Sequence, residues 1–249
     1  MMRHTFKILA AGALLACLPL MAAQAADSSD RSESLDLANN AIRVLDQIEQ
    51  APDHAIPLDL LRNAKAVAVI PDVVKAGFVF GGRHGEGLVS VRLSDGTWSY
   101  PVYVDVTGGS VGFQAGVSST DVVLVFRTQR GVDGIVNGKF TLGANAGVAA
   151  GPVGRDAHAS TDAQLKAEIY SYSRSRGLFA GVALDGTAIT IDYDDNAAVY
   201  GSSITPRRIF EGGVSNVPSQ VAAFRDRLMR YSQAGSTPAT GASATGSGN

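Results

Sequence analysis

Residues 88–106 read LVSVRLSDGTWSYPVYVDV, two runs rich in β-branched and aromatic residues on either side of an Asp95-Gly96 pair. Apolar residues recur with a period close to two in both runs, as in strands that are buried on one face. Asp-Gly between two such runs favours a tight hairpin turn, because glycine adopts positive φ without a steric penalty. The stretch therefore predicts an antiparallel pair of strands, and the neighbouring sequence extends the same pattern.

Turn signals and buried strands continue through the middle of the chain. Residues 122–126 predict a buried strand, Asn137-Gly138 predicts a turn, and residues 181–192 predict a second hairpin around Asp185-Gly186. The 28 glycines follow no fixed period and occur with only 9 prolines, which excludes a collagen-like chain and favours many tight turns. Hydrophobic residues make up 45% of the 249 residues, enough for a substantial core.

Helical periodicity is found near both ends of this region. Residues 34–50 place apolar side chains at helical spacing with Ser34 as the expected N-cap, and residues 58–69 form a second candidate whose end also fits a strand. Residues 218–231 carry an apolar stripe that fits a core face better than an interfacial helix. We expect an α+β fold: a mainly antiparallel, glycine-rich sheet or barrel-like core with N-terminal helices and a C-terminal helix.

The two termini have compositions that set them apart. Residues 1–25 have a cationic start, an apolar segment and a small-x-small site at Ala23-Gln24-Ala25, as in a secretory signal peptide, so we expect a periplasmic or secreted protein. The alternative is a lipoprotein anchored through Cys17, the only cysteine in the chain. The remaining sequence divides into a short linker at 26–33, a single domain at 34–232 and a disordered Gly/Ser/Thr/Ala tail at 233–249.

Charge and short motifs argue against several functional classes. A formal net charge of −2 makes nucleic acid an unfavourable partner. Residues 108–112 match the G-x-S-x-G pattern of hydrolases, which would make Ser110 a nucleophile and His158 its base. The glycine-rich and β-branched sequence that follows is a poor helix former, so the strand-turn-helix context is missing and no catalytic residue is expected. A weak esterase remains an alternative function.

Nucleotide, calcium and zinc motifs are also incomplete. Residues 134–140 lack the spacing and the Ser or Thr of a P-loop, and residues 81–87 lack the order and the helix of a dinucleotide site. Residues 192–203 begin like a calcium loop, but Ala197 and Ser203 replace its glycine and its bidentate glutamate. His54, His84 and His158 are far apart in the sequence. We therefore expect no metal and no cofactor.

Residues 170–176 suggest a binding face. In an extended chain Tyr170, Tyr172, Arg174 and Arg176 would project from one side of a strand. Arginine binds phosphate oxygens bidentately, and tyrosine suits the lipid headgroup boundary. The alternative is an ordinary solvated sheet face with cross-strand and cation-π pairs. Further candidates beside glycine turns are Arg155, Lys139 and Arg83.

Five stretches together resemble one known family, that of the SYLF domain. They are residues 64–87 (AKAVAVIPDVVKAGFVFGGRHGEG), 99–126 (SYPVYVDVTGGSVGFQAGVSSTDVVLVF), 140–157 (FTLGANAGVAAGPVGRDA), 168–186 (EIYSYSRSRGLFAGVALDG) and 198–201 (AVYG). The resemblance runs from about Ser34 to Phe210. It implies a noncatalytic domain that associates with phospholipid, and with membranes and actin in eukaryotic members; we do not carry actin association over to an exported protein.

We therefore expect an exported, noncatalytic domain that binds phospholipid, another amphiphile or an anionic membrane surface. Arg174, Arg176 and Arg155 would capture the phosphate headgroup, with Tyr170, Tyr172 and Lys139 beside them. The alternative within the binding class is a structural or partner-binding envelope protein, whose protein partner the sequence does not name.

Overall fold

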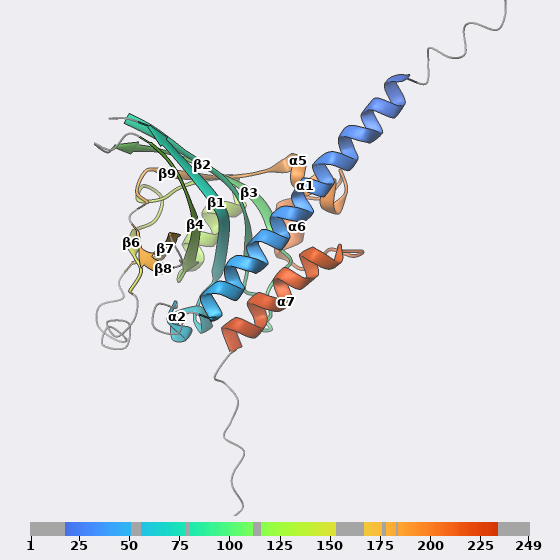
Figure 1. The fold of residues 1–249 in the computed structure, drawn as a ribbon. Coiled ribbons are helices and arrows are strands. Elements are labelled where there is room, and N and C mark those ends of the chain that lie inside the picture. Colours follow the sequence, from blue (N-terminus) through green and yellow to red (C-terminus); the bar gives the residue numbers. More distant parts are fainter. Residues whose placement is uncertain are drawn as a thin grey trace, which may run out of the picture.

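The computed structural model describes residues 18–50, 56–77, 80–111, 116–152, 167–175, 178–182 and 184–233. The helices are α1 (Leu18–Glu49), α2 (Leu58–Arg62), α3 (Gln129–Val136), α5 (Tyr193–Tyr200), α6 (Pro206–Phe210) and α7 (Ser219–Gln233). The strands are β1 (Ala66–Gly77), β2 (Phe80–Val91), β3 (Val102–Val111), β4 (Gly116–Phe126), β5 (Lys139–Thr141), β6 (Val148–Ala150), β7 (Ile169–Ser175), β8 (Leu178–Gly181) and β9 (Thr187–Ile191). Figure 1 shows their arrangement.

The described strands form one curled sheet in the order β5-β9-β3-β2-β1-β4-β7-β6, with β8 paired to β7. Of the pairs within the described residues, β6 and β7 are parallel and the others are antiparallel. The expected α+β class is confirmed, and so is the first hairpin, in which β2 and β3 pair from Val89↔Val102 to Phe80↔Val111.

An irregularity in β1 divides the sheet into two parts. The pairing register of β1 shifts between Val69 and Val74 against β2, and between Ile70 and Val73 against β4. Pro71 has no N–H for the ladder, and Asp72 has a φ of 50°, so the strand bulges here. Before the bulge β1 is buried, whereas most of its residues after the bulge are exposed.

We call the part beyond the bulge the distal sheet: residues 73–77, 80–86, 105–111 and 116–121.

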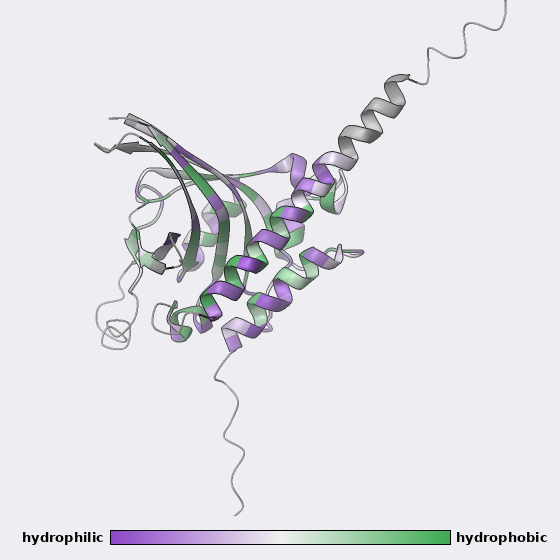
Figure 2. Cartoon of the chain, viewed as in Figure 1, coloured by the Kyte–Doolittle hydropathy of each residue, from purple (hydrophilic) through white to green (hydrophobic). Residues whose placement is uncertain are grey.

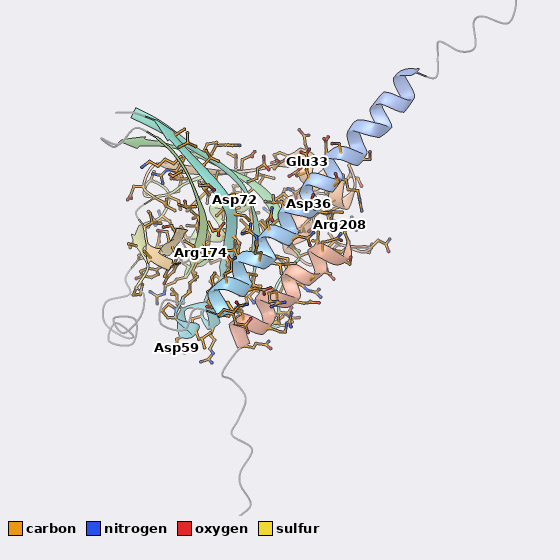
Figure 3. The ribbon with its side chains drawn as sticks, in the orientation of Figure 1. Glu33, Asp36, Asp59, Asp72, Arg174 and Arg208 are labelled. Carbon is orange, nitrogen blue, oxygen red and sulfur yellow. The ribbon has the colours of Figure 1, made fainter. Side chains whose placement is uncertain are left out.

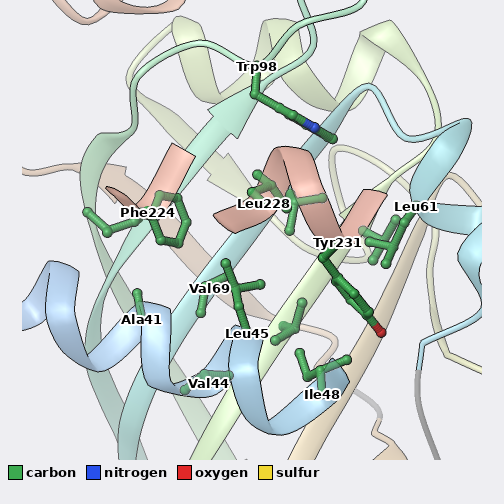
Figure 4. Close-up of a cluster of buried hydrophobic side chains, with 14 of the residues drawn as sticks. Ala41, Val44, Leu45, Ile48, Leu61, Val69, Trp98, Phe224, Leu228 and Tyr231 are labelled. Atoms are coloured by element: carbon green, nitrogen blue, oxygen red, sulfur yellow. The ribbon is translucent and has the colours of Figure 1, made fainter. Parts of the chain in front are cut away.

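One hydrophobic cluster lies between the sheet and the two long helices. α1 and α7 run across the same face of the sheet (Figure 1), and α1 turns a hydrophobic stripe toward it (Figure 2). Figure 4 shows side chains of α1 and α7 meeting Val69 of β1 and the Trp98 ring. The Trp98 Nε1–H donates to Ser232 Oγ at 3.0 Å, so its polar atom is satisfied. The residues predicted for the α7 stripe are all buried: Val221, Phe224, Leu228 and Tyr231.

A second cluster covers the opposite face of the sheet. It joins alternate residues of β1 to β4 with side chains of α3, α6, β5 and β9. Phe126 and Phe140 pack near its centre with ring centroids 6.2 Å apart. The part of the sheet before the bulge is therefore buried on both faces, which explains why its strands contain nearly continuous apolar runs.

Several local expectations were wrong, for reasons of tertiary contact. Ser34 does not cap α1; it lies within the helix, is buried, and donates to Asp30 O and Asp195 Oδ1. Residues 26–33, expected to be a linker, belong to α1. The hairpin expected around Asp185-Gly186 does not form, because β8 pairs with β7 while β9 pairs with β3 and β5. α3, α5 and α6 were not predicted.

The packing of α7 makes a direct prediction. Phe224→Ala should lower the free energy of unfolding by about 3–5 kcal/mol, because its fully buried ring leaves a cavity. Val117→Ala is the control: that side chain is 77% exposed, so the change should stay within about 0.5 kcal/mol. Urea unfolding measures both. Similar losses in the two variants would contradict the packing of α7 on the sheet.

Candidate functional site

The tyrosines of the predicted tyrosine-arginine face do not point outward. Tyr170 and Tyr172 do share one face of β7, as the alternation predicted, but they are 4% and 0% exposed. They fill the space under the helices in the first hydrophobic cluster. The expected amphipathic surface at these tyrosines was therefore wrong, because the face that carries them is the one covered by the helices.

Arg174 lies at the edge of this covered region, in an ionic network. Its Nη1 donates to Asp121 Oδ2 at 3.2 Å and also to Gln47 of α1, and its side chain is 21% exposed. Asp121 in turn accepts the backbone N–H of Asp72 at 3.2 Å, and Asp72 pairs with Arg43 of α1 at 3.3 Å. Figure 3 shows Asp72 and Arg174 beside α1. The network joins α1 to the bulge in β1, so the structure gives Arg174 a bridging position.

Other predicted site residues cannot be placed. Arg155, Arg176 and His158 lie outside the described residues. Lys139 begins β5 and Ser110 lies in β3, but their side chains are outside what is described. Their expected roles in headgroup binding, or in the alternative esterase, stay predictions.

A row of residues, most of them hydrogen-bond donors, crosses the distal sheet and continues onto the neighbouring strand β9. Five residues are consecutive Cα partners on neighbouring strands, in the order Ser118 (β4), Lys75 (β1), Arg83 (β2), Gly108 (β3) and Thr187 (β9). Directly paired residues have side chains on the same face of a sheet, here the face opposite α1 and α7. We call these five residues the donor row. One hydroxyl group and two cations lie on one side of the glycine, and the second hydroxyl group lies on the other.

Two polar atoms of the donor row have no partner among the residues that the structure describes. Arg83 Nε and Thr187 Oγ1 are both buried there without a hydrogen bond, and Thr187 is only 1% exposed. Burial lowers the pKa of the Arg83 guanidinium. Lys75 stands directly opposite Arg83, and like charges in this position repel. Within the described residues neither cation has an acidic partner, so the row is suited to an anion.

Gly108 keeps the middle of the donor row open. A Cβ on this residue would lie 3.1 Å from Thr187 Oγ1 and 3.2 Å from Arg83 Cγ. Both contacts are tighter than ordinary van der Waals distances, so a larger residue would fill the space between the guanidinium stem and the hydroxyl.

The other face of the distal sheet carries exposed apolar side chains. Val74 and Val117 are 43% and 77% exposed, and both lie close to the ends of their strands. Gly82 and Gly109 are Cα partners there, and a Cβ on Gly109 would meet nothing within 4 Å. This end of the sheet thus combines cations on one face with exposed apolar side chains on the other.

Three metal-ligating side chains also meet on that second face. Ligand atoms of His84, Glu86 and Asp105 lie within 4.8 Å of one another. Burial raises the pKa of Asp105, and the nearby Asp192 carboxylate raises it further, whereas His84 lowers it. Spacing between histidines did not predict this group, because only one of its three side chains is a histidine. His84-x-Glu86 on one strand face was the available signal, but Asp105 joins it only through strand pairing.

Little of the donor row could be predicted from the sequence. The neighbouring glycines make Arg83 a candidate, but no local pattern marks Lys75, because the row forms only when five strands pair in register.

A surface hollow of ≈ 570 Å³ lies elsewhere, where α3 and α6 meet the end of β2. Its lining mixes charges of both signs, including Asp133, Arg207 and Glu211, so it favours no single ligand chemistry.

Among the described helices, none has the length and apolarity needed to cross a membrane.

The ionic network predicts unequal effects of two aspartate substitutions. Asp121→Ala should cost about 2–3 kcal/mol of unfolding free energy, because it removes the buried carboxylate that accepts from both the Arg174 guanidinium and the Asp72 N–H. Asp59→Ala removes an exposed i,i+3 pair with Arg62 and should cost less than about 1 kcal/mol. Chemical denaturation compares them. Equal losses would show that the Asp121 network does not hold α1 to the bulge.

Comparison with known proteins adds a family to this geometry. Residues 107–231 match the family described as "Ysc84: Las17-binding protein actin regulator". The chain is 40% identical over 176 residues to LAS seventeen-binding protein 3 of Saccharomyces cerevisiae, covering 70% of this chain and 38% of that protein. It is 40% identical over 170 residues to Protein YSC84 of the same yeast, covering 67% of this chain and 36% of that protein.

A human relative extends the comparison. SH3 domain-containing YSC84-like protein 1 of Homo sapiens is 34% identical over 183 residues, which are 73% of this chain and 53% of that protein. The chain thus spans about half or less of the length of these relatives. The matched residues include the donor-row positions on β3, β4 and β9. The chain belongs to the Ysc84 family, the family of the SYLF domain.

Proposed function

We propose that this chain is a noncatalytic binding module whose ligand is an anionic phospholipid or a similar phosphate-bearing amphiphile. The donor row carries the proposal: among the described residues its two cations have no acidic partner and the buried Thr187 hydroxyl has no hydrogen-bond partner. The names of the family and of the yeast relative refer to a binding protein and an actin regulator, which supports a noncatalytic role.

A phosphate group suits the chemistry of the row. Its oxygens accept charge-assisted hydrogen bonds from guanidinium and ammonium groups, which are stronger than neutral ones. A negative charge between Lys75 and Arg83 would replace their mutual repulsion by two attractions. Thr187 Oγ1 would gain the partner that it lacks. The first of these gains requires an anionic ligand, and a phosphate oxygen can supply the second as well.

The position of the row favours a ligand in a membrane surface. The ends of β1 to β4 meet at one edge of the sheet, where Gly77 pairs with Gly81 and Gly116, and Phe80 pairs with Val111. Val117 lies one residue from that edge and Val74 lies three residues from it. The cations lie on one face of this end of the sheet and the exposed valines on the other, so both reach anionic lipid if this end of the sheet inserts into the membrane surface.

We propose that the protein acts after export, in the periplasm or outside the cell. Side chains of α1 from Ser28 to Glu33 are exposed, and its buried side chains begin at Ser34. Cleavage after Ala25 would therefore leave the packed part of α1 intact. Anchoring through a lipidated Cys17 would also bring the domain to a membrane, and mass spectrometry of the exported protein distinguishes the two.

A protein partner is the main rival. The names of the family and of the yeast relative refer to Las17 binding and actin regulation. A structural or partner-binding envelope protein would use the same exposed sheet for protein contacts and would not sediment with vesicles.

Lipid binding is tested with the full chain and vesicles of phosphatidylglycerol and phosphatidylcholine. We expect co-sedimentation with the anionic vesicles that weakens as salt rises, and little binding to phosphatidylcholine alone. Lys75→Gln/Arg83→Gln should weaken binding roughly 30-fold, since each cation near an anionic surface contributes about 1 kcal/mol.

Matched variants separate a specific site from general charge. Arg207→Gln/Arg208→Gln removes the same charge from an exposed position and should change binding less than about threefold. Arg155→Gln/Arg176→Gln tests the remaining predicted site in the same assay. Circular dichroism establishes that each variant is folded. Equal losses in the first two variants, or no vesicle binding by the unmodified chain, would contradict the donor row as the lipid site.

A further inference from the structure

We propose that His84, Glu86 and Asp105 form a binding site for a divalent first-row transition metal, of which Zn²⁺ is the representative. The site lies on the face of the distal sheet opposite the donor row. It is independent of the proposed lipid function, since neighbouring residues Arg83 and His84 project from opposite sides of β2.

Regular strand geometry brings the three side chains together. His84 and Glu86 are two residues apart on β2 and so share a face. Asp105 of β3 is the direct Cα partner of Glu86, and His84 pairs with Thr107 two residues further along. Both strands are internal to the sheet, which fixes their register. One imidazole nitrogen and two carboxylate oxygens therefore converge within 4.8 Å on a rigid support.

The three groups have no protein partner that competes for their lone pairs. Within the described part of the chain, none of them makes a hydrogen bond or an ion pair. Glu86 and Asp105 stand directly opposite each other, an arrangement in which like charges repel. A bound dication would turn that repulsion into two attractions. His84 supplies a neutral ligand, so the charge of the three ligands matches that of the metal.

The types of ligand atom restrict which metal ions the site can bind. Imidazole nitrogen suits Zn²⁺, Cu²⁺, Ni²⁺ and Fe²⁺, whereas Mg²⁺ and Ca²⁺ prefer oxygen alone. Three protein ligands leave room for water, because Zn²⁺ takes at least four. His84 and Glu86 are exposed and Asp105 is half-buried, so the site is open to the solvent. An open, three-ligand site of this type can accept a metal without a change of fold.

Isothermal titration of the full chain with Zn²⁺ tests the proposal. We expect one ion per chain and no comparable binding of Mg²⁺ at the same concentration. His84→Ala should weaken Zn²⁺ binding at least tenfold, and Glu86→Gln should do so while leaving the backbone pairing in place. Zn²⁺ should raise the melting temperature of the unmodified chain and not that of His84→Ala.

His54→Ala is the matched control, since it removes a histidine from another part of the chain and should leave the affinity within about twofold. Zn²⁺ binding that is equally weakened by His54→Ala, unchanged in His84→Ala, or matched by Mg²⁺ would overturn the site. Absence of heat and of a melting shift in the unmodified chain would overturn it as well. Phosphatidylglycerol binding by folded His84→Ala should stay unchanged, which separates this proposal from the lipid site.

Discussion

The architecture depends on the bulge of β1 at Pro71 and Asp72. Up to this point β1 lies between two hydrophobic clusters, one under α1 and α7 and one on the opposite face. Beyond it the strand continues without cover from the long helices. The ionic network of Arg43, Asp72, Asp121 and Arg174 sits at this boundary and ties α1 to the place where cover ends. One interruption in a hydrogen-bond ladder thus separates a part of the sheet covered by the long helices from a part in which most residues of β1 are exposed.

The chemistry of the distal sheet follows from that division. Beyond the bulge most residues of β1 are exposed, so the apolar alternation can lapse there and the two faces can carry different polar groups. The face away from the helices carries the donor row, with Lys75 and Arg83 side by side and Thr187 unsatisfied. The other face carries His84, Glu86 and Asp105 beside exposed valines. Both faces place like charges opposite each other, which costs stability in the unliganded protein and favours ligands of opposite charge.

Local sequence patterns predicted the elements better than their partners. Asp95-Gly96 and the alternation around it correctly indicated the β2–β3 pair, and the stripe of α7 is buried as expected. Asp185-Gly186 has the same local signal but joins strands that pair elsewhere, because pairing depends on contacts distant in sequence. Alternation also put Tyr170, Tyr172 and Arg174 on one face, yet it could not say that α1 and α7 cover that face. Coverage is a property of the whole fold, and for that reason the sequence could not show that Tyr170 and Tyr172 are buried.

Binding of a phosphate group at the donor row can be observed by an NMR titration of the ¹⁵N-labelled full chain with a short-chain phosphatidylglycerol below its micelle concentration. We expect the largest amide shifts at Lys75, Arg83, Gly108, Ser118 and Thr187, across five strands that are adjacent only in the folded sheet. Shifts confined to α1 and α7, with the five row residues unchanged, would contradict binding at the donor row.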